Sequence, residues 1–152
     1  MTDKSYYKNL RAYKGISLRK LSELTGIHYQ QINRFEEGKT KLSEEQIKII
    51  QEILGFSALK DTESYQRSLK IFHEFYRDAA YDNIDFDKYE KLIHDKPTDI
   101  NEKIVFLVMK YAICMIKGDI KGSLEIEPLL SKYIIENEYV GAVYMDYKAF
   151  RI

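Results

Sequence analysis

Polar groups that can read nucleic-acid bases are concentrated in one short segment, residues 28–34, of this 152-residue chain. A solvent-exposed helix more often carries Glu and Lys pairs, and neither type occurs in this segment, the first being Glu36. Carboxamides pair with the edge of adenine and guanidinium groups with the edge of guanine in a DNA major groove. The segment therefore predicts a helix that reads bases, and the residues expected to face them are Tyr29, Gln30, Gln31, Asn33 and Arg34.

Residues 16–38 contain the pattern needed to hold such a helix in place. Ser17 is suited to cap the start of a first helix, and Gly26 falls where that helix must end and the chain reverse. Leucines at the spacing of one helical side precede the glycine, and apolar residues that would anchor a second helix follow it. These apolar positions are Leu18, Leu21 and Leu24, and then Ile27, Ile32 and Phe35.

The ends of these two helices offer groups for the DNA backbone. The N-terminus of a helix attracts anions, and lysines or hydroxyls beside a recognition helix bind phosphate oxygens. The residues expected to contact phosphates are Ser17, His28, Lys39, Thr40 and Lys41.

Positive charge is concentrated in the first part of the chain, because residues 1–43 hold nine Lys and Arg against four Asp and Glu. Since the whole chain has zero net charge, this part is +5 and residues 44–152 are −5, as expected for a basic DNA-binding part.

Residues 6–55 resemble the Cro and phage-repressor type of helix-turn-helix, the XRE family. The positions that agree are Leu10-Arg11, Leu21-Ser22, Leu24, Gly26-Ile27, Ile32, Phe35-Glu36 and Gly38-Lys39. The resemblance implies a lambda-repressor-like DNA-binding domain of at most five helices, in which Arg11 and Glu36 form a structural ion pair. Two positions depart from the family pattern: Leu18 replaces the usual glutamine near the start of helix 2, and His28 replaces the usual Ser or Thr cap of the recognition helix.

The rest of the chain reads as helical, so the expected fold class is all-α, with a helix-turn-helix domain over residues 1–57 and a helical domain over 60–152. Residues 56–59 are expected to link the two. Gly122 and Pro128 are expected to interrupt the helical pattern after Asp119, with Pro128 opening a fresh helix to about Glu136. The other helices are expected at about 5–13, 44–54, 62–80, 86–94, 100–117 and 141–150.

The second half contains a weak repeat, because Asp82-Asn83-Ile84 is echoed 36 residues later by Gly118-Asp119-Ile120. Tetratricopeptide units have a similar period, but an ordinary helical bundle explains it equally well. The combination resembles the peptide-pheromone regulators of the RRNPP group, which implies a short peptide as a possible ligand. The expected helix 100–117 is apolar almost all round, more than one small bundle can cover, and this predicts a homodimer through the C-terminal helices. The residues behind that prediction are Ile104, Phe106, Leu107, Val108, Tyr111, Ile113 and Met115, with Tyr139, Val140, Val143, Tyr144 and Tyr147.

Other classes of function find no support in the sequence. Its three histidines and single Cys114 have no metal-ligand spacing, and neither a phosphate-cradling glycine loop nor a nucleophile elbow occurs. We therefore expect no enzyme, no cofactor and no metal, and Cys114 is interpreted as a core residue. No apolar run is long enough to span a membrane and no signal peptide is recognisable, which predicts a cytoplasmic protein. The expected function is a dimeric transcriptional regulator binding double-stranded DNA; the alternative is an interaction module or antagonist that pairs with another regulator.

Overall fold

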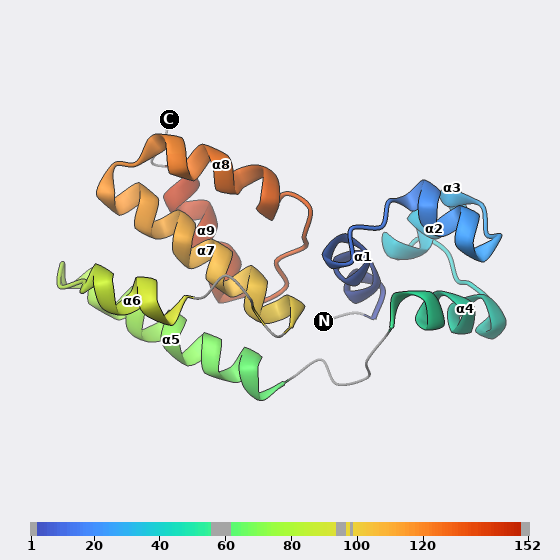
Figure 1. The fold of residues 1–152 in the computed structure, drawn as a ribbon, viewed down its shortest axis with the longest axis horizontal. Coiled ribbons are helices and arrows are strands. Elements are labelled where there is room, and N and C mark those ends of the chain that lie inside the picture. Colours follow the sequence, from blue (N-terminus) through green and yellow to red (C-terminus); the bar gives the residue numbers. More distant parts are fainter. Residues whose placement is uncertain (1–2, 56–61, 94–96, 98, 150–152) are drawn as a thin grey trace. The chain divides into compact units, whose positions relative to one another are not determined.

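The computed structural model describes residues 3–55, 62–93, 97 and 99–149, and every regular element among them is an α-helix (Figure 1). This confirms the all-α prediction. The chain divides into two compact units, Met1–Ala58 and Leu59–Ile152, and each is described by itself. The link expected at 56–59 lies outside the described residues. The helices are α1 (Asp3–Tyr13), α2 (Leu18–Thr25), α3 (Tyr29–Glu36), α4 (Glu44–Leu54), α5 (Glu63–Ala80), α6 (Phe86–Leu92), α7 (Ile100–Lys117), α8 (Ile120–Leu130) and α9 (Glu138–Ala149).

Local capping groups set the helix ends of the first unit. The Ser17 hydroxyl accepts a hydrogen bond from the Lys20 backbone N–H at 3.0 Å, which satisfies an otherwise unpaired donor of α2. Gly26 ends α2 in the left-handed conformation, with φ of 75°, which glycine adopts without a steric penalty. Ser43 and Gln46 form a reciprocal capping box at the start of α4. The predicted helix-turn-helix pair therefore follows from short-range interactions.

The first unit buries one apolar core, to which α1, α2, α3 and α4 all contribute. Leu24 was expected on this core and is instead 48% exposed. The side of α2 that packs against α3 and α4 is centred on Leu21, which is 1% exposed, and Leu24 lies off that side. The buried apolar residues are Tyr6, Tyr7, Leu10, Leu21, Ile27, Ile32, Phe35, Leu42, Ile50 and Leu54.

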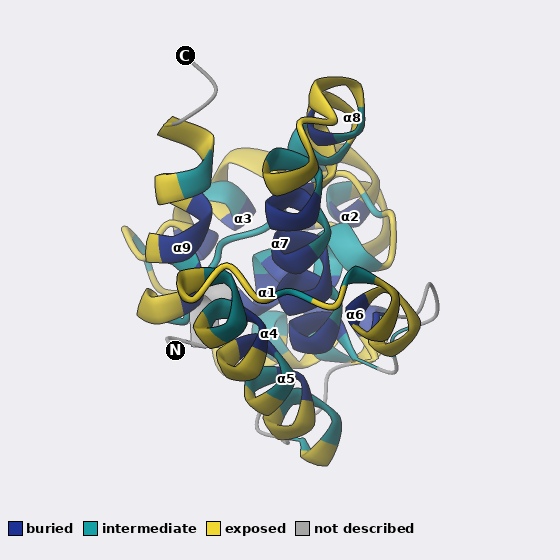
Figure 2. Ribbon diagram, turned by 90° about the vertical axis from the view of Figure 1, so that its left-hand side faces the viewer, coloured by how far each residue is buried: buried dark blue, intermediate teal, exposed yellow. Residues whose placement is uncertain are grey.

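The second unit is built around α7, which is buried along most of its length (Figure 2). Asp99 caps it by accepting a hydrogen bond from the Glu102 backbone N–H at 2.8 Å, and Asp99 also accepts one from the Thr62 hydroxyl at the start of α5. Helices α5, α8 and α9 each pack on α7. The core joins Phe72 and Phe75 of α5 to the apolar residues of α7 and α9.

The packing around α7 contradicts the argument that its apolar surface needs a second copy of the chain. Of the seven α7 residues expected to be in surplus, six are buried within the single chain, and Met115 is partly buried. Val140, Val143 and Tyr144 of α9 are buried as well. The flanking helices of the same unit cover α7, so its apolar character requires no second copy.

The region around Gly122 and Pro128 also differs from the prediction, because α8 runs through both residues from Ile120 to Leu130. Pro128 lies in the last turn of α8, where its ring removes the backbone hydrogen bond to the Leu124 carbonyl, and the helix ends two residues later at Leu130. The Ser131 hydroxyl donates to the Pro128 carbonyl at 2.8 Å just beyond the helix end. No helix opens at Pro128; the next begins at Glu138. The predicted ends at His94 and Phe150 lie outside the described residues.

Gly122 lies at a crowded position, between the Asp119 cap of its own helix and Cys114 of α7. A Cβ atom at this position would collide with the Asp119 carboxylate and lie 2.9 Å from the Cys114 Sγ. That carboxylate caps α8 by accepting a hydrogen bond from the Gly122 backbone N–H at 2.9 Å. Alanine would gain about 1 kcal/mol of helix propensity but disturb a cap worth about 0.5–2 kcal/mol and the packing at the sulfur.

We therefore expect Gly122→Ala to lower the free energy of unfolding by about 1 kcal/mol. The stability lost from the disturbed cap and packing exceeds the stability gained from the higher helix propensity of alanine. Urea denaturation followed by circular dichroism measures it. Gly141→Ala in α9 is the matched control, because its Cβ would meet only Ile135 atoms at 3.7 and 3.8 Å, an ordinary contact. This control is expected to stabilise the chain, and a stabilising Gly122→Ala would show that the approach is not tight.

Three further features bear on other kinds of function. Burial, reinforced by the nearby Asp119, raises the pKa of the Cys114 thiol, which disfavours the thiolate that a nucleophile needs. Within the described ranges no three His, Cys, Asp or Glu side chains are grouped to hold a metal ion. No described helix combines the length and the apolar character needed to cross a membrane.

Candidate nucleic-acid interface

The start of α3 is capped by His28, whose Nδ1 accepts a hydrogen bond from the Gln30 backbone N–H at 3.2 Å. A neutral imidazole that accepts at Nδ1 carries its proton on Nε2. His28 is exposed, so this Nε2–H is available as a donor beside the helix N-terminus, where an anion is favoured. The histidine thus performs the capping role of the Ser or Thr found in the family pattern and adds a possible phosphate donor.

Helix α3 separates a buried side from an exposed one. Ile32, Phe35 and Glu36 are buried, whereas four of the five predicted base-reading residues are exposed and Asn33 is partly exposed. At 100° per residue, the five side chains form one continuous exposed arc, with Tyr29 at one edge and Gln31 at the other. The residues at the centre of the arc are Gln30, Asn33 and Arg34.

Two neighbours hold the ring of Tyr29. The His28 ring stacks on it with centroids 4.7 Å apart and planes at 25°, and the Arg19 guanidinium carbon lies 5.9 Å from its centroid. Arg19 belongs to the first turn of α2 and is exposed. The sequence interpretation did not select Arg19, although it directly follows Leu18, which replaces the phosphate-binding glutamine of the family pattern. The signal in the sequence that could have found Arg19 was its positive charge directly after that position.

The predicted phosphate contacts differ in how available their side chains are. The Ser17 hydroxyl oxygen accepts the cap hydrogen bond from Lys20, which leaves its O–H free to donate to a phosphate. Lys39 Nζ pairs with Glu37 Oε2 at 3.0 Å, and hydrogen bonding to Lys39 lowers the pKa of the exposed Glu37 carboxyl. Lys41 is exposed and forms no ion pair with any described residue. Lys41 is thus the most accessible cation after the recognition helix.

Thr40 is placed differently from the other predicted phosphate contacts. Its hydroxyl oxygen is buried and has no hydrogen-bond partner among the described residues. A hydroxyl in this position does not face solvent, so its placement argues against a phosphate contact through the Thr40 side chain. Contact through that hydroxyl would need the side chain to rotate outward.

Arg11 and Glu36 form a bidentate pair that joins α1 to α3. Arg11 Nε donates to Glu36 Oε2 at 2.9 Å, and Nη2 donates to Oε1 at 3.0 Å. Arg11 Nη1 also donates to the Ile16 carbonyl at 3.0 Å, which fixes the chain just before α2. The Glu36 side chain is 2% exposed and that of Arg11 13%. Because neither charge faces solvent, the pair fixes the orientation of α3 and is not available to bind DNA.

Comparison with known proteins identifies this unit. Residues 8–60 match the family model for a helix-turn-helix domain, and this stretch contains most of α1 and all of α2, α3 and α4. The N-terminal unit is accordingly similar to a helix-turn-helix of the XRE type over this stretch. Neither the curated proteins nor the solved structures gave a match. Nothing in these comparisons concerns residues 61–152, so the tetratricopeptide-like arrangement stays a prediction.

Proposed function

We propose that the chain is a sequence-specific DNA-binding transcriptional regulator in which α3 enters the major groove and α2 crosses the backbone. The observation that carries the proposal is the arc of base-reading side chains on α3, presented to solvent while the opposite side is buried. The match of residues 8–60 to the helix-turn-helix model supports the same function.

The chemistry of the arc assigns a role to each side chain. Gln30 suits the N6 and N7 groups of adenine, and Arg34 suits O6 and N7 of guanine. The Tyr29 ring, restrained by His28 and Arg19, offers an apolar surface to a thymine methyl group. Asn33 Nδ2 donates to Glu37 Oε1 at 3.5 Å, a long contact that is weak at best. Binding bases would therefore break little internal hydrogen bonding.

Phosphate contacts are proposed for the cations around this arc. Arg19 lies at the first turn of α2, close to the Tyr29 ring, and Lys39 and Lys41 follow α3. Each neutralised phosphate releases bound counterions, so affinity falls as salt rises. The pair of Lys39 with Glu37 must open or be shared for Lys39 to take part.

We expect Lys41→Ala to weaken binding about equally on all duplex sequences and to reduce the slope of log affinity against log salt by about one. Fluorescence anisotropy of the full chain on labelled duplexes, repeated over a range of salt concentrations, measures both quantities. Lys121→Ala on α8 is the matched control and should leave the slope unchanged. An unchanged slope for Lys41→Ala would remove this residue from the interface.

We also propose a homodimer on a two-fold operator, since one helix-turn-helix reads few base pairs and pairing doubles the contacts. The dimer is supported by three apolar side chains that the single chain leaves exposed: Ile116, Ile120 and Leu124 are 37%, 46% and 50% exposed. Ile120 and Leu124 are four residues apart and so share one side of α8. The other proposed occupant of this side is a short peptide, through which the regulator would respond to a signal.

Sedimentation equilibrium of the full chain tests the dimer. We expect a dimer that Leu124→Glu converts to monomer, because a charge would be buried in the interface. Met145→Glu is the control, since Met145 is 60% exposed on α9 and its substitution should leave the dimer intact. A monomer for the unaltered chain at micromolar concentration would contradict the dimer and leave the exposed side of α8 to a peptide.

The second candidate function is an interaction module or antagonist that keeps the helix-turn-helix and pairs with another regulator. Two observations favour it: Leu18 stands where the family pattern has a phosphate-binding glutamine, and residues 44–152 carry a net charge of −5. Such a module would show no salt-dependent binding to duplex DNA, which is the opposite outcome of the same measurement.

A further inference from the structure

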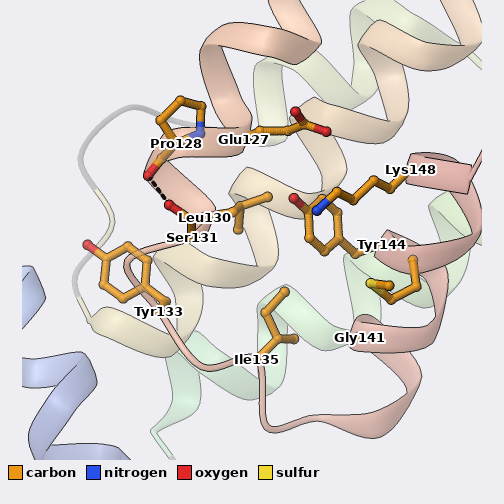
Figure 3. Close-up of a pocket in the computed structure, with 10 residues that line it drawn as sticks. Glu127, Pro128, Leu130, Ser131, Tyr133, Ile135, Gly141, Tyr144 and Lys148 are labelled. Atoms are coloured by element: carbon orange, nitrogen blue, oxygen red, sulfur yellow. Dashed lines mark hydrogen bonds between the residues drawn. The ribbon is translucent and has the colours of Figure 1, made fainter. Parts of the chain in front are cut away.

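A pocket of about 680 Å³ opens in the second unit, between the C-terminal end of α8, the following segment and α9 (Figure 3). This volume is within the range of about 300–1,000 Å³ that small-molecule sites occupy. Neither the proposed reading of DNA nor the exposed side of α8 around Leu124 uses this pocket. Its main lining residues are Glu127, Leu130, Ile135, Tyr144, Met145 and Lys148.

Contacts with α7 hold two walls of the pocket in place. The Tyr111 hydroxyl donates to Glu127 Oε1 at 2.9 Å, and this fixes the wall formed by α8. The Tyr111 ring meets the Tyr144 ring edge-on, with centroids 5.0 Å apart and planes at 79°, and this fixes the wall formed by α9. Tyr111 itself is fully buried. The pocket is therefore formed without a ligand and would need little rearrangement on binding.

The lining combines an apolar wall with one available cation. Leu130 and Ile135 form part of the apolar surface, and Met145 extends it while remaining 60% exposed. Lys148 Nζ lies 5.8 Å from the centroid of the Tyr144 ring and has no ion-pair partner among the residues that the structure describes. The Glu127 carboxylate also lines the pocket and keeps its negative charge, and its Oε1 accepts a hydrogen bond from Tyr111. The lining therefore offers a positive charge to a ligand beside an apolar surface.

We propose that this pocket binds a small amphipathic carboxylate, with its apolar part against Leu130, Ile135 and Met145 and its carboxylate at the Lys148 ammonium. Burial of apolar ligand surface supplies the main driving force, and the ammonium selects an anionic head group over a neutral one. A ligand in this place touches α8 and α9 together, the two helices that flank the pocket. The site would act as an effector site of the second unit, and it does not depend on DNA binding.

Methyl NMR of the full chain tests the proposal, because the chain contains four methionines and one of them lines the pocket. Protein labelled with ¹³C at the methionine methyl groups is titrated with sodium octanoate and, separately, with 1-octanol. We expect a saturable shift of the Met145 signal with octanoate, and a smaller change at Met115, which lies on α7 outside the lining. Lys148→Gln should weaken octanoate binding roughly five-fold, the effect of one partly exposed ion pair, and should leave octanol binding unchanged.

Lys121→Gln is the matched control, since it removes a lysine from α8 that does not line the pocket, and octanoate affinity should not change. Circular dichroism of both variants establishes that they fold. The absence of a saturable Met145 shift would overturn the proposal. An octanoate affinity that is equal in the unaltered chain and in Lys148→Gln would overturn it as well, because the carboxylate would then have no specific partner.

Discussion

Replacing Glu36 by alanine is expected to lower the stability of the N-terminal unit by about 3–5 kcal/mol, the cost of leaving one partner of a buried ion pair without the other. Glu36 is almost fully buried and accepts two hydrogen bonds from the Arg11 guanidinium. Without the carboxylate, a charge that is 13% exposed is left with only the Ile16 carbonyl as its partner. Hydrogen exchange followed by mass spectrometry measures the loss as reduced protection of the α3 amides.

Glu37 provides the matched control, because it is the next residue and pairs with Lys39 on the surface. Glu37→Ala should change stability by no more than about 0.5 kcal/mol, the usual effect of a surface substitution. The double variant Arg11→Met with Glu36→Leu should recover much of the loss, since an apolar pair of similar volume replaces the charges. Similar effects of Glu36→Ala and Glu37→Ala would show that the Arg11–Glu36 pair does not hold α3.

The second large effect is expected at Arg34, the proposed reader of guanine. Arg34→Ala should weaken binding to the selected operator by about 1–3 kcal/mol and relax the base preference at one position, because a bidentate contact is lost. Its binding to unrelated duplexes should change little by comparison. Affinities on the operator, on each single-base variant of it and on an unrelated duplex measure both parts of the prediction.

Gln31→Ala tests the arc itself. Gln31 is exposed but lies at one edge of the arc, beside the buried Phe35, whereas Arg34 lies nearer its centre. Its removal should alter base preference less than that of Arg34. A uniform loss of affinity in Arg34→Ala, with base preference unchanged, would contradict the assignment of α3 as the reading helix.

The parts of the fold that the sequence predicts well are those set by local interactions. Caps such as Ser17, Ser43, Thr62 and Asp99 bond to backbone groups within three residues, and Gly26 ends α2 by its own backbone freedom. These signals stand next to the helices they define, so the start of each capped helix follows from a few neighbouring letters.

The parts that the sequence does not predict depend on contacts between distant segments. Gly122 reads as a helix breaker, yet it allows α8 to approach Cys114 on α7. The prediction that α7 has more apolar surface than one chain can cover was wrong for the same reason. How much of that surface is buried depends on how many helices pack around α7, and the sequence does not give that number. Pro128 was expected to open a helix, the position that proline prefers, and it lies instead inside α8, two residues before that helix ends.

The candidate site divides in the same way. The composition of residues 28–34 was sufficient to propose a reading helix, and the spacing places its polar side chains on the exposed side of α3, as the structure has them. Arg19 required the structure, because its proximity to Tyr29 crosses the turn between two helices. Thr40 required it too, since residue type alone cannot tell a buried hydroxyl from an exposed one.

The most direct test of the central claim is selection of duplexes by the full chain from a random DNA library, with binding of the selected duplex then measured across salt concentrations. The account predicts an enriched sequence containing guanine and adenine contacts, a two-fold repeat of that sequence, and affinity that falls as salt rises. A library that stays random after repeated rounds, with no salt-dependent binding to any duplex, would contradict DNA recognition by α3 and favour the interaction module instead.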